Sequence, residues 1–181
     1  MLLLILGLLL WSLSHMLRRI APTYRAELGK RGYRMVAIAS GVGIVLMIFG
    51  YRAWDSGQLW YPPAGMRHVN NLLMLIAIYL FAASGMKTWV ARRFRHPMLT
   101  GVIVWAVAHL LVNGDWASVV LFGGMLVWAL LEMALINRDE PQWVPPSGGS
   151  AGKEIGAIVG AVVVLGVIGY IHGMLGYWPF G

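Results

Sequence analysis

Six apolar runs, each close to the length of a membrane-spanning helix, constrain this chain more than any other feature. A spanning helix needs roughly 20 predominantly apolar residues. Of the 181 residues, 59% are hydrophobic and only 12% are charged, whereas about a quarter of the residues in a soluble domain are charged. The sequence therefore predicts an all-α, polytopic integral membrane protein, with one transmembrane helical domain over residues 1–181. The predicted spans cover residues 1–17, 35–54, 69–86, 97–113, 116–136 and 155–174.

The basic residues predict how these spans are oriented. With six spans, twelve of the fourteen lysines and arginines fall on one side of the membrane, and only Arg52 and Arg67 fall on the other. Short loops rich in lysine and arginine stay in the cytoplasm. We therefore expect both termini on the outer, periplasmic side of a bacterial inner membrane. The net charge of +7 then indicates contact with anionic lipid in the bilayer and no nucleic-acid partner.

The absence of cysteine narrows the chemistry. The chain contains no cysteine, which excludes disulfides, thiolate haem ligands, iron–sulfur clusters and cysteine nucleophiles. It also shows no nucleophile triad, no phosphate-binding loop and no HExxH zinc motif. Histidine is the remaining candidate for metal or cofactor chemistry.

Three of the five histidines lie inside predicted spans, and these are His15, His109 and His172. The lipid core offers no water to the ring nitrogens, so each imidazole needs a partner. Neutral imidazole is the commonest metal ligand among side chains and a frequent axial ligand of haem iron. The alternative is a simple hydrogen bond to a neighbouring helix. His68 and His96 lie at the ends of spans, where water or a capping role can satisfy them.

Depth along the helices limits which histidines can act together. At 1.5 Å per residue, His109 lies roughly 18 Å from the cytoplasmic end of its span, near the outer end. His172 also lies near the outer end of its span, so depth pairs His109 with His172. His15 lies about one turn from Arg18, nearer the cytoplasmic face. Arg18 and Arg95 serve as topology signals, and they are also candidates for holding haem propionates or a phosphate head group.

Local signals predict how the spans are joined. Asn113 and Gly114 are suited to close the fourth helix in the left-handed conformation, and Asp115 is suited to cap the start of the fifth. We therefore expect the fourth and fifth spans to form a tight antiparallel hairpin. In the last span, two pairs of glycines at a spacing of four residues predict close helix contact. These pairs are Gly156 with Gly160 and Gly169 with Gly173.

Several of these segments together resemble the NnrU family of membrane proteins. They are SHMLRR around His15, the loop LWYPP, the run RHPMLTGVIVWAVAHLLVNGD that contains His109, and His172 followed by Gly173. The family includes proteins linked to denitrification gene clusters and the plant 15-cis-zeta-carotene isomerase. The resemblance extends over nearly the whole chain, and the RHP to HLLVNGD core is its most specific part.

The resemblance implies a small multi-spanning protein that holds haem b. It also implies a lipophilic polyene substrate for an isomerase, or a factor that supports nitrite and nitric oxide reduction. In the isomerase branch the first-span and fourth-span histidines are implicated as iron ligands, and they match His15 and His109 here. A position that can be cysteine in the isomerase is Ala106 in this chain, so ligand switching through a thiolate is absent. The resemblance thus pairs His109 with His15, whereas depth pairs it with His172.

Two other functions remain open. The run RHPMLTGVIVW also resembles the RHPxYxGxxLW element of isoprenylcysteine and phospholipid methyltransferases, which helps to hold S-adenosylmethionine. Here Leu99 replaces the aromatic residue, and only the separate Glu132, Glu140 and Glu154 are available for the double-glutamate segment of those enzymes. The other alternative is a non-enzymatic assembly partner of a membrane complex, or a homo-oligomer, docked through the glycine-rich last span. The substrate, the oligomeric state and even enzymatic activity are not determined by the residues themselves.

Overall fold

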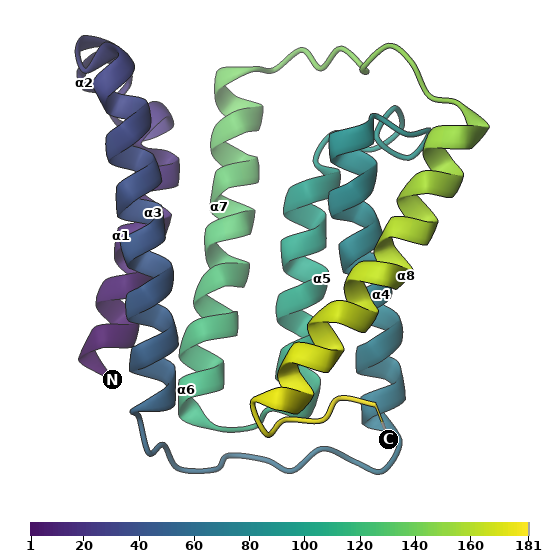
Figure 1. The fold of residues 1–181 in the computed structure, drawn as a ribbon. Coiled ribbons are helices and arrows are strands. Elements are labelled where there is room, and N and C mark those ends of the chain that lie inside the picture. Colours follow the sequence, from purple (N-terminus) through teal and green to yellow (C-terminus); the bar gives the residue numbers. More distant parts are fainter. Residues whose placement is uncertain (181) are drawn as a thin grey trace. The chain divides into compact units, whose positions relative to one another are not determined.

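A computed structural model of the protein describes residues 1–180, and it is helical along most of that length (Figure 1). Among the described residues the only bridge between extended segments is an isolated antiparallel one, which joins Gln58 and Asp115. The contacts group the chain into two compact units: Met1–Trp60 with Gly114–Pro141, and Tyr61–Asn113 with the residues from Gln142 onward. This grouping does not by itself separate two folding domains, so the single transmembrane domain stays a prediction.

The first unit is built on an antiparallel pair of helices, α1 (Leu2–Ile20) and α3 (Gly29–Arg52), joined through the short helix α2 (Pro22–Glu27) (Figure 1). Glycine lets the two backbones approach closely. A Cβ atom on Gly7 would lie 2.7 Å from the Gly43 carbonyl oxygen, and one on Gly43 would lie 3.0 Å from the Gly7 carbonyl oxygen. Small residues at such contacts are the usual means of close packing between membrane helices.

The rest of the first unit is one apolar stretch made of α6 (Trp116–Ser118), the π-helical turn η1 (Val119–Gly123) and α7 (Gly124–Asp139), which packs against α1. Asp115 caps its start, because the carboxylate Oδ1 accepts a hydrogen bond from the Ser118 backbone N–H at 2.9 Å. The capping role predicted for Asp115 is therefore confirmed. A π-helical turn inside an apolar helix is rare and widens the helix locally.

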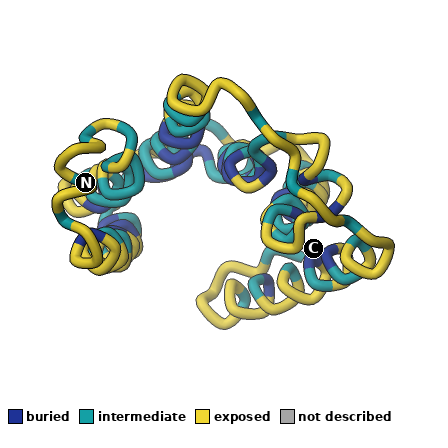
Figure 2. Tube along the Cα trace, turned by 90° about the horizontal axis from the view of Figure 1, so that it is seen from above, coloured by how far each residue is buried: buried dark blue, intermediate teal, exposed yellow. Residues whose placement is uncertain are grey.

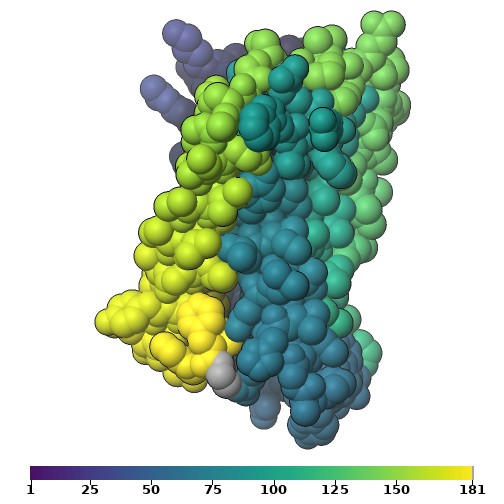
Figure 3. All heavy atoms as spheres, turned by 90° about the vertical axis from the view of Figure 1, so that its right-hand side faces the viewer, coloured from purple at the N-terminus to yellow at the C-terminus, as the bar shows by residue number. Residues whose placement is uncertain are grey.

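The second unit is centred on α4 (Met66–Met86), which contacts both α5 (Pro97–Val112) and α8 (Ala151–Met174). Figure 3 shows α8 lying along α4, with the yellow C-terminal tail beside the start of α4. The Asn71 side-chain amide holds this tail by donating a hydrogen bond to the Pro179 carbonyl oxygen at 3.0 Å.

The helices have the length and composition of membrane spans. Five helical stretches are long and apolar enough to cross a membrane, and they are Leu2–Ile20, Gly29–Arg52, Met66–Met86, Trp116–Asp139 and Ala151–Met174. Helix α5 is also apolar but has only 16 residues. Figure 2 shows exposed residues of every kind in yellow. Large apolar side chains are exposed along the helices. Such surfaces are solvated by lipid and not by water. The protein is thus an all-helical, multi-pass membrane protein, whereas its orientation and the identity of the membrane stay predictions.

The connection between α5 and α6 differs from the prediction. Helix α5 packs on α4 in the second unit and α7 packs on α1 in the first, so the hairpin of the fourth and fifth spans stays a prediction. Asn113 is extended, with φ −121° and ψ 101°, and not left-handed. Its backbone N–H and its side-chain amide both donate to the His109 carbonyl oxygen at 2.9 Å, which ends the helix without a left-handed residue. The Gly114 carbonyl oxygen then accepts hydrogen bonds from the backbone N–H groups of Leu59 and Trp60.

The glycine pairs of α8 also differ from the prediction. A Cβ atom on Gly173 would lie 2.5 Å from the ring of Trp178, and one on Gly169 would overlap the ring of Phe180. This pair therefore receives aromatic rings of the chain's own C-terminal tail, and not another helix. Gly156 lies against the Met86 side chain, whereas Gly160 has open space before it. The spacing in the sequence could not predict this outcome, because a flat glycine surface accepts a ring as readily as a helix.

Candidate functional site

The three histidines inside the helices share one hydrogen-bonding arrangement. In each, Nδ1 lies 2.8–2.9 Å from the backbone carbonyl oxygen of the residue four positions earlier. A carbonyl oxygen only accepts, so Nδ1 carries the proton and Nε2 carries the lone pair. This is the tautomer that coordinates a metal through Nε2, with the ring oriented by its second nitrogen. The pairs are His15 with Trp11, His109 with Trp105, and His172 with Ile168.

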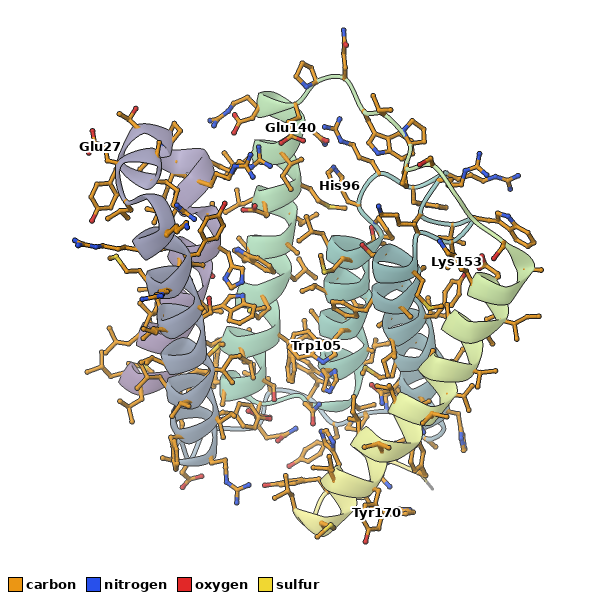
Figure 4. All side chains as sticks on the ribbon, turned by 45° about the horizontal axis from the view of Figure 1, so that its top comes forward. Glu27, His96, Trp105, Glu140, Lys153 and Tyr170 are labelled. Atoms are coloured by element: carbon orange, nitrogen blue, oxygen red, sulfur yellow. The ribbon has the colours of Figure 1, made fainter. Side chains whose placement is uncertain are left out.

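His109 and His172 come together in the second unit. Both side chains line one small pocket between α5, α8 and the start of α4. His109 is half-buried, and the Trp105 ring lies against it with 5.2 Å between the ring centroids. Figure 4 shows Trp105 on α5, among the side chains that surround this helix. His172 is exposed. His109 and His172, the two histidines predicted to lie at the same depth, thus line the same pocket in the structure.

The size of this pocket limits what it can hold. Its volume is about 50 Å³, whereas sites for organic ligands have volumes of about 300–1,000 Å³ and a water molecule in the liquid occupies about 30 Å³. The Asn70 side-chain oxygen is buried there and hydrogen bonds to no described residue. The pocket therefore suits a water or another small polar molecule. It is too small for a porphyrin lying between the rings of His109 and His172, so the pocket does not support their joint ligation of one haem. That pairing stays a prediction from depth alone.

His15 lies in a different setting, in the first unit. Its ring is 4.1 Å from the Trp11 ring and 5.5 Å from the Trp128 ring, measured between centroids. The indole N–H groups of both tryptophans are buried and hydrogen bond to no described residue. One carboxylate oxygen of Glu132, a turn after Trp128 on α7, is also buried without a hydrogen-bond partner in the described chain. His15 is therefore surrounded by polar atoms that a bound group or water could satisfy.

The same local motif occurs once in each unit. Trp11 precedes His15 by four residues, and Trp105 precedes His109 by four residues. In both, the tryptophan carbonyl fixes the imidazole tautomer and the indole ring packs against the imidazole. Residues four apart lie on the same face of a helix, so the spacing alone brings them into contact. The sequence analysis considered the histidines and did not single out Trp11. The Trp-x-x-x-His spacing, which occurs twice, is the sequence pattern that could have identified it.

The remaining candidates lie outside these two clusters. Arg18 is exposed in the last turn of α1, and Arg95 is half-buried just before α5. The neighbouring Arg19 forms ion pairs with Asp139 at 3.6 Å and with Glu140 at 2.9 Å, which joins α1 to the end of α7. His68 is exposed in the first turn of α4. Within residues 1–180, no three His, Cys, Asp or Glu side chains gather as a metal site would require, but haem iron needs only one or two protein ligands.

The family described as NnrU protein matches residues 3–179. The chain belongs to the NnrU family. No curated protein and no solved structure matches this NnrU-family chain.

The RHP element of this NnrU-family protein has a structural role that accounts for its sequence. His96 is the residue that precedes α5, and Pro97 occupies the first helical position. Proline is favoured there because its missing N–H would have no helical partner and its φ suits the helix. The element that resembles the methyltransferase motif is thus the start of the apolar helix α5. The family match over nearly the whole chain favours NnrU over a methyltransferase.

Proposed function

We propose that this NnrU-family protein binds haem b in the membrane, that His109 would hold the iron, and that the protein acts on a lipid-soluble polyene as a cis–trans isomerase. The observation that supports the haem is the fixed tautomer of the intramembrane histidines, which leaves Nε2 as the coordinating nitrogen. The bound haem would supply a redox-active iron that can polarise and relax a conjugated double bond. Isomerisation changes no atom count and requires no net oxidant.

The setting of the histidines supports a lipid-soluble substrate. His15 and His109 lie on helices whose neighbouring side chains are mainly apolar. A polyene partitions into this environment, whereas a small anion such as nitrite would lose its hydration there. In a role in nitrite and nitric oxide reduction, this protein would therefore support a partner protein in the membrane and would not bind nitrite itself.

The chain's own residues orient the histidines that would hold the iron. The Trp105 carbonyl oxygen holds the Nδ1–H of His109, and the Trp105 ring covers one side of the imidazole. In the first unit, the Trp11 carbonyl oxygen does the same for His15. A fixed imidazole loses less conformational freedom on binding a metal than a mobile one.

The experiment is the optical spectrum of the protein purified after expression with ample haem. We expect a Soret band that is lost in His109→Ala and retained in His68→Ala, because His68 is exposed at the start of α4. Added imidazole should restore the band in His109→Ala if the residue is an axial ligand, but not if the variant misfolds. Comparing His15→Ala with His172→Ala identifies the second ligand. A wild-type protein with no Soret band would exclude haem.

The isomerase activity needs a separate measurement. The haem-loaded protein in vesicles is given a polyene with one central cis double bond, and its geometric isomers are separated by chromatography. We expect conversion to the trans isomer with no change in mass, and none in His109→Ala. Haem binding without conversion, together with a stoichiometric copurifying membrane partner, would support the role in nitrite and nitric oxide reduction instead.

A further inference from the structure

A basic pocket lies at one end of the second unit, between the turn that follows α4 and the loop that precedes α8. It has a volume of about 280 Å³ and is lined by Trp89, Arg92, Arg93 and Pro145. The segment 87–95 that supplies most of the lining contains four basic residues and no acidic one. The volume approaches the lower end of the range for small-ligand sites, about 300 Å³.

Specific contacts hold the two walls of this pocket together. The Glu154 carboxylate, in the first turn of α8, accepts hydrogen bonds from the Trp89 backbone N–H at 3.0 Å and from the Tyr79 hydroxyl of α4. Gly149 packs flat on the other side, where a Cβ atom would lie 2.9 Å from the Trp89 ring and 3.3 Å from Cδ of Arg92. Its φ of 94° is also one that other residues rarely adopt. The pocket is thus formed by packing and is not a chance gap between loops.

The charge of the pocket is not neutralised by the protein. The side chains of Arg92 and Arg93 are exposed, and the ion pairs of the described chain involve Arg19 and Arg138 instead. The Glu154 carboxylate on the adjoining helix α8 already accepts hydrogen bonds from the Tyr79 hydroxyl and the Trp89 backbone N–H. Two neighbouring guanidinium groups without carboxylate partners are suited to a phosphate, which accepts paired hydrogen bonds from arginine.

The position of the pocket indicates where the phosphate comes from. Helix α4 ends at Met86 and α8 begins at Ala151, so the pocket lies at the ends of two membrane spans. Figure 4 labels Lys153 at this end of α8 and Tyr170 near the opposite end. Trp89 is 47% exposed, as is usual for a tryptophan at the boundary between lipid and water. This is the level at which phospholipid head groups lie.

We propose that the pocket formed by Trp89, Arg92, Arg93 and Pro145 binds the phosphate of an anionic phospholipid head group. The two guanidinium groups contact the phosphate, and Trp89 packs against the glycerol and the upper acyl chain. A zwitterionic choline lipid binds less well, because its ammonium group is repelled by the same arginines. The site needs no haem and does not depend on the proposed isomerase activity.

The test counts lipids bound to the purified full-length protein in detergent by native mass spectrometry, during titration with phosphatidylglycerol or phosphatidylcholine. The test variant is Arg92→Gln with Arg93→Gln, and the matched control is Arg31→Gln with Arg34→Gln, two exposed arginines of α3. Each basic residue near a membrane surface contributes roughly fivefold to affinity for anionic lipid. We therefore expect phosphatidylglycerol to bind roughly 25-fold more weakly to the test variant than to the wild type. We also expect it to bind at least roughly fivefold more weakly to the test variant than to the control, because the arginines of the control do not line the pocket.

Each outcome decides the proposal. Equal weakening in the test and control variants would show that general surface charge attracts the lipid, and equal binding of the two lipids would remove the role of the phosphate; either result overturns the proposal. Soluble glycerol 3-phosphate separates a lipid from a free phosphate ester. We expect it to compete only at concentrations far above those of the lipid. Competition at the lipid's own concentration would overturn the lipid assignment and identify a soluble phosphate ester as the ligand.

Discussion

Replacing Gly50 by alanine is expected to destabilise the pairing of α1 and α3. A Cβ atom on Gly50 would lie 2.7 Å from Cα of Leu4 and 2.8 Å from the carbonyl carbon of Leu3. These are backbone atoms, so they can move only if the whole of α1 moves. Overpacking inside a well-packed core costs about 1–3 kcal/mol, and contact with backbone on both sides favours the upper end of that range. The measurement is the unfolding free energy in mixed micelles, followed by circular dichroism as a denaturing detergent is titrated.

Gly41→Ala is the matched control on the same helix. Gly41 is exposed, and a Cβ atom placed on it meets no other atom within 4 Å. Alanine is more favourable than glycine in a helix by about 0.5–1 kcal/mol, so Gly41→Ala should be neutral or slightly stabilising. Opposite signs for the two substitutions would show that the close approach at Gly50, and not helix propensity, sets the result. If both variants unfold at the same detergent concentration, the α1–α3 interface is not as close as described.

Replacing Asp115 by alanine is expected to be the second large loss of stability. The carboxylate accepts hydrogen bonds from the Ser118 backbone N–H at 2.9 Å, from the Ser118 hydroxyl at 2.7 Å and from the Ser56 hydroxyl at 3.0 Å. The Ser118 hydroxyl is fully buried and also hydrogen bonds to the Tyr51 hydroxyl. Loss of a helix cap costs about 0.5–2 kcal/mol, and a buried polar group left without its partner costs about 1–3 kcal/mol. We expect a total of about 2–4 kcal/mol in the same unfolding measurement.

The charge of Asp115 adds a dependence on pH. Burial by itself raises the pKa of this carboxyl, but the hydrogen bonds from Ser118 and Ser56 outweigh burial and bring the pKa below its ordinary value. A pKa that is lower in the folded protein means that the stabilisation is complete above the unfolded value, about 3.9, and is lost as the pH falls through the folded value. Asp115→Asn keeps the shape and removes the titration. The stability difference between wild type and Asp115→Asn should therefore shrink below about pH 4, and a constant difference would contradict this assignment.

The helices could be predicted from the sequence because the length and the apolar composition of a segment are enough to indicate a membrane span. Each predicted span coincides with a helix, and the signals at Asp115 and Pro97 place the starts of two of them. The interior turn of π-helix at Val119–Gly123 and the short α2 were not predicted. A π-helical turn adds one residue to a turn of the helix but leaves the run apolar. Hydropathy therefore cannot reveal the turn at Val119–Gly123. Helix α2 lies in a polar segment, where apolar periodicity gives no guide.

The candidate site was predicted in part. The three intramembrane histidines stand out because an ionisable residue in an apolar run is rare. In the structure, Nδ1 of each lies at hydrogen-bonding distance from the carbonyl oxygen four residues earlier. The roles of Trp11, Trp128 and the buried carboxylate oxygen of Glu132 were missed. Trp128 and Glu132 reach the surroundings of His15 from a helix more than a hundred residues later in the chain, and no local pattern encodes such a contact.

By itself, the sequence determined that this chain is a multi-pass membrane protein of the NnrU family. It also predicted that histidine would carry any coordinating chemistry. Those conclusions depend on properties that each segment has alone: apolar length, charge and an ionisable histidine within an apolar run. Only the tertiary structure decided that His109 and His172 line one small pocket, that aromatic rings fill the glycine surface of α8, and that Arg92 and Arg93 face a cavity closed by Pro145. The physical reason is that the apolar segments of this chain have similar hydrophobicity, so hydropathy favours no packing partner over another. The choice depends on how well the shapes of two surfaces fit, and a single segment does not contain that information.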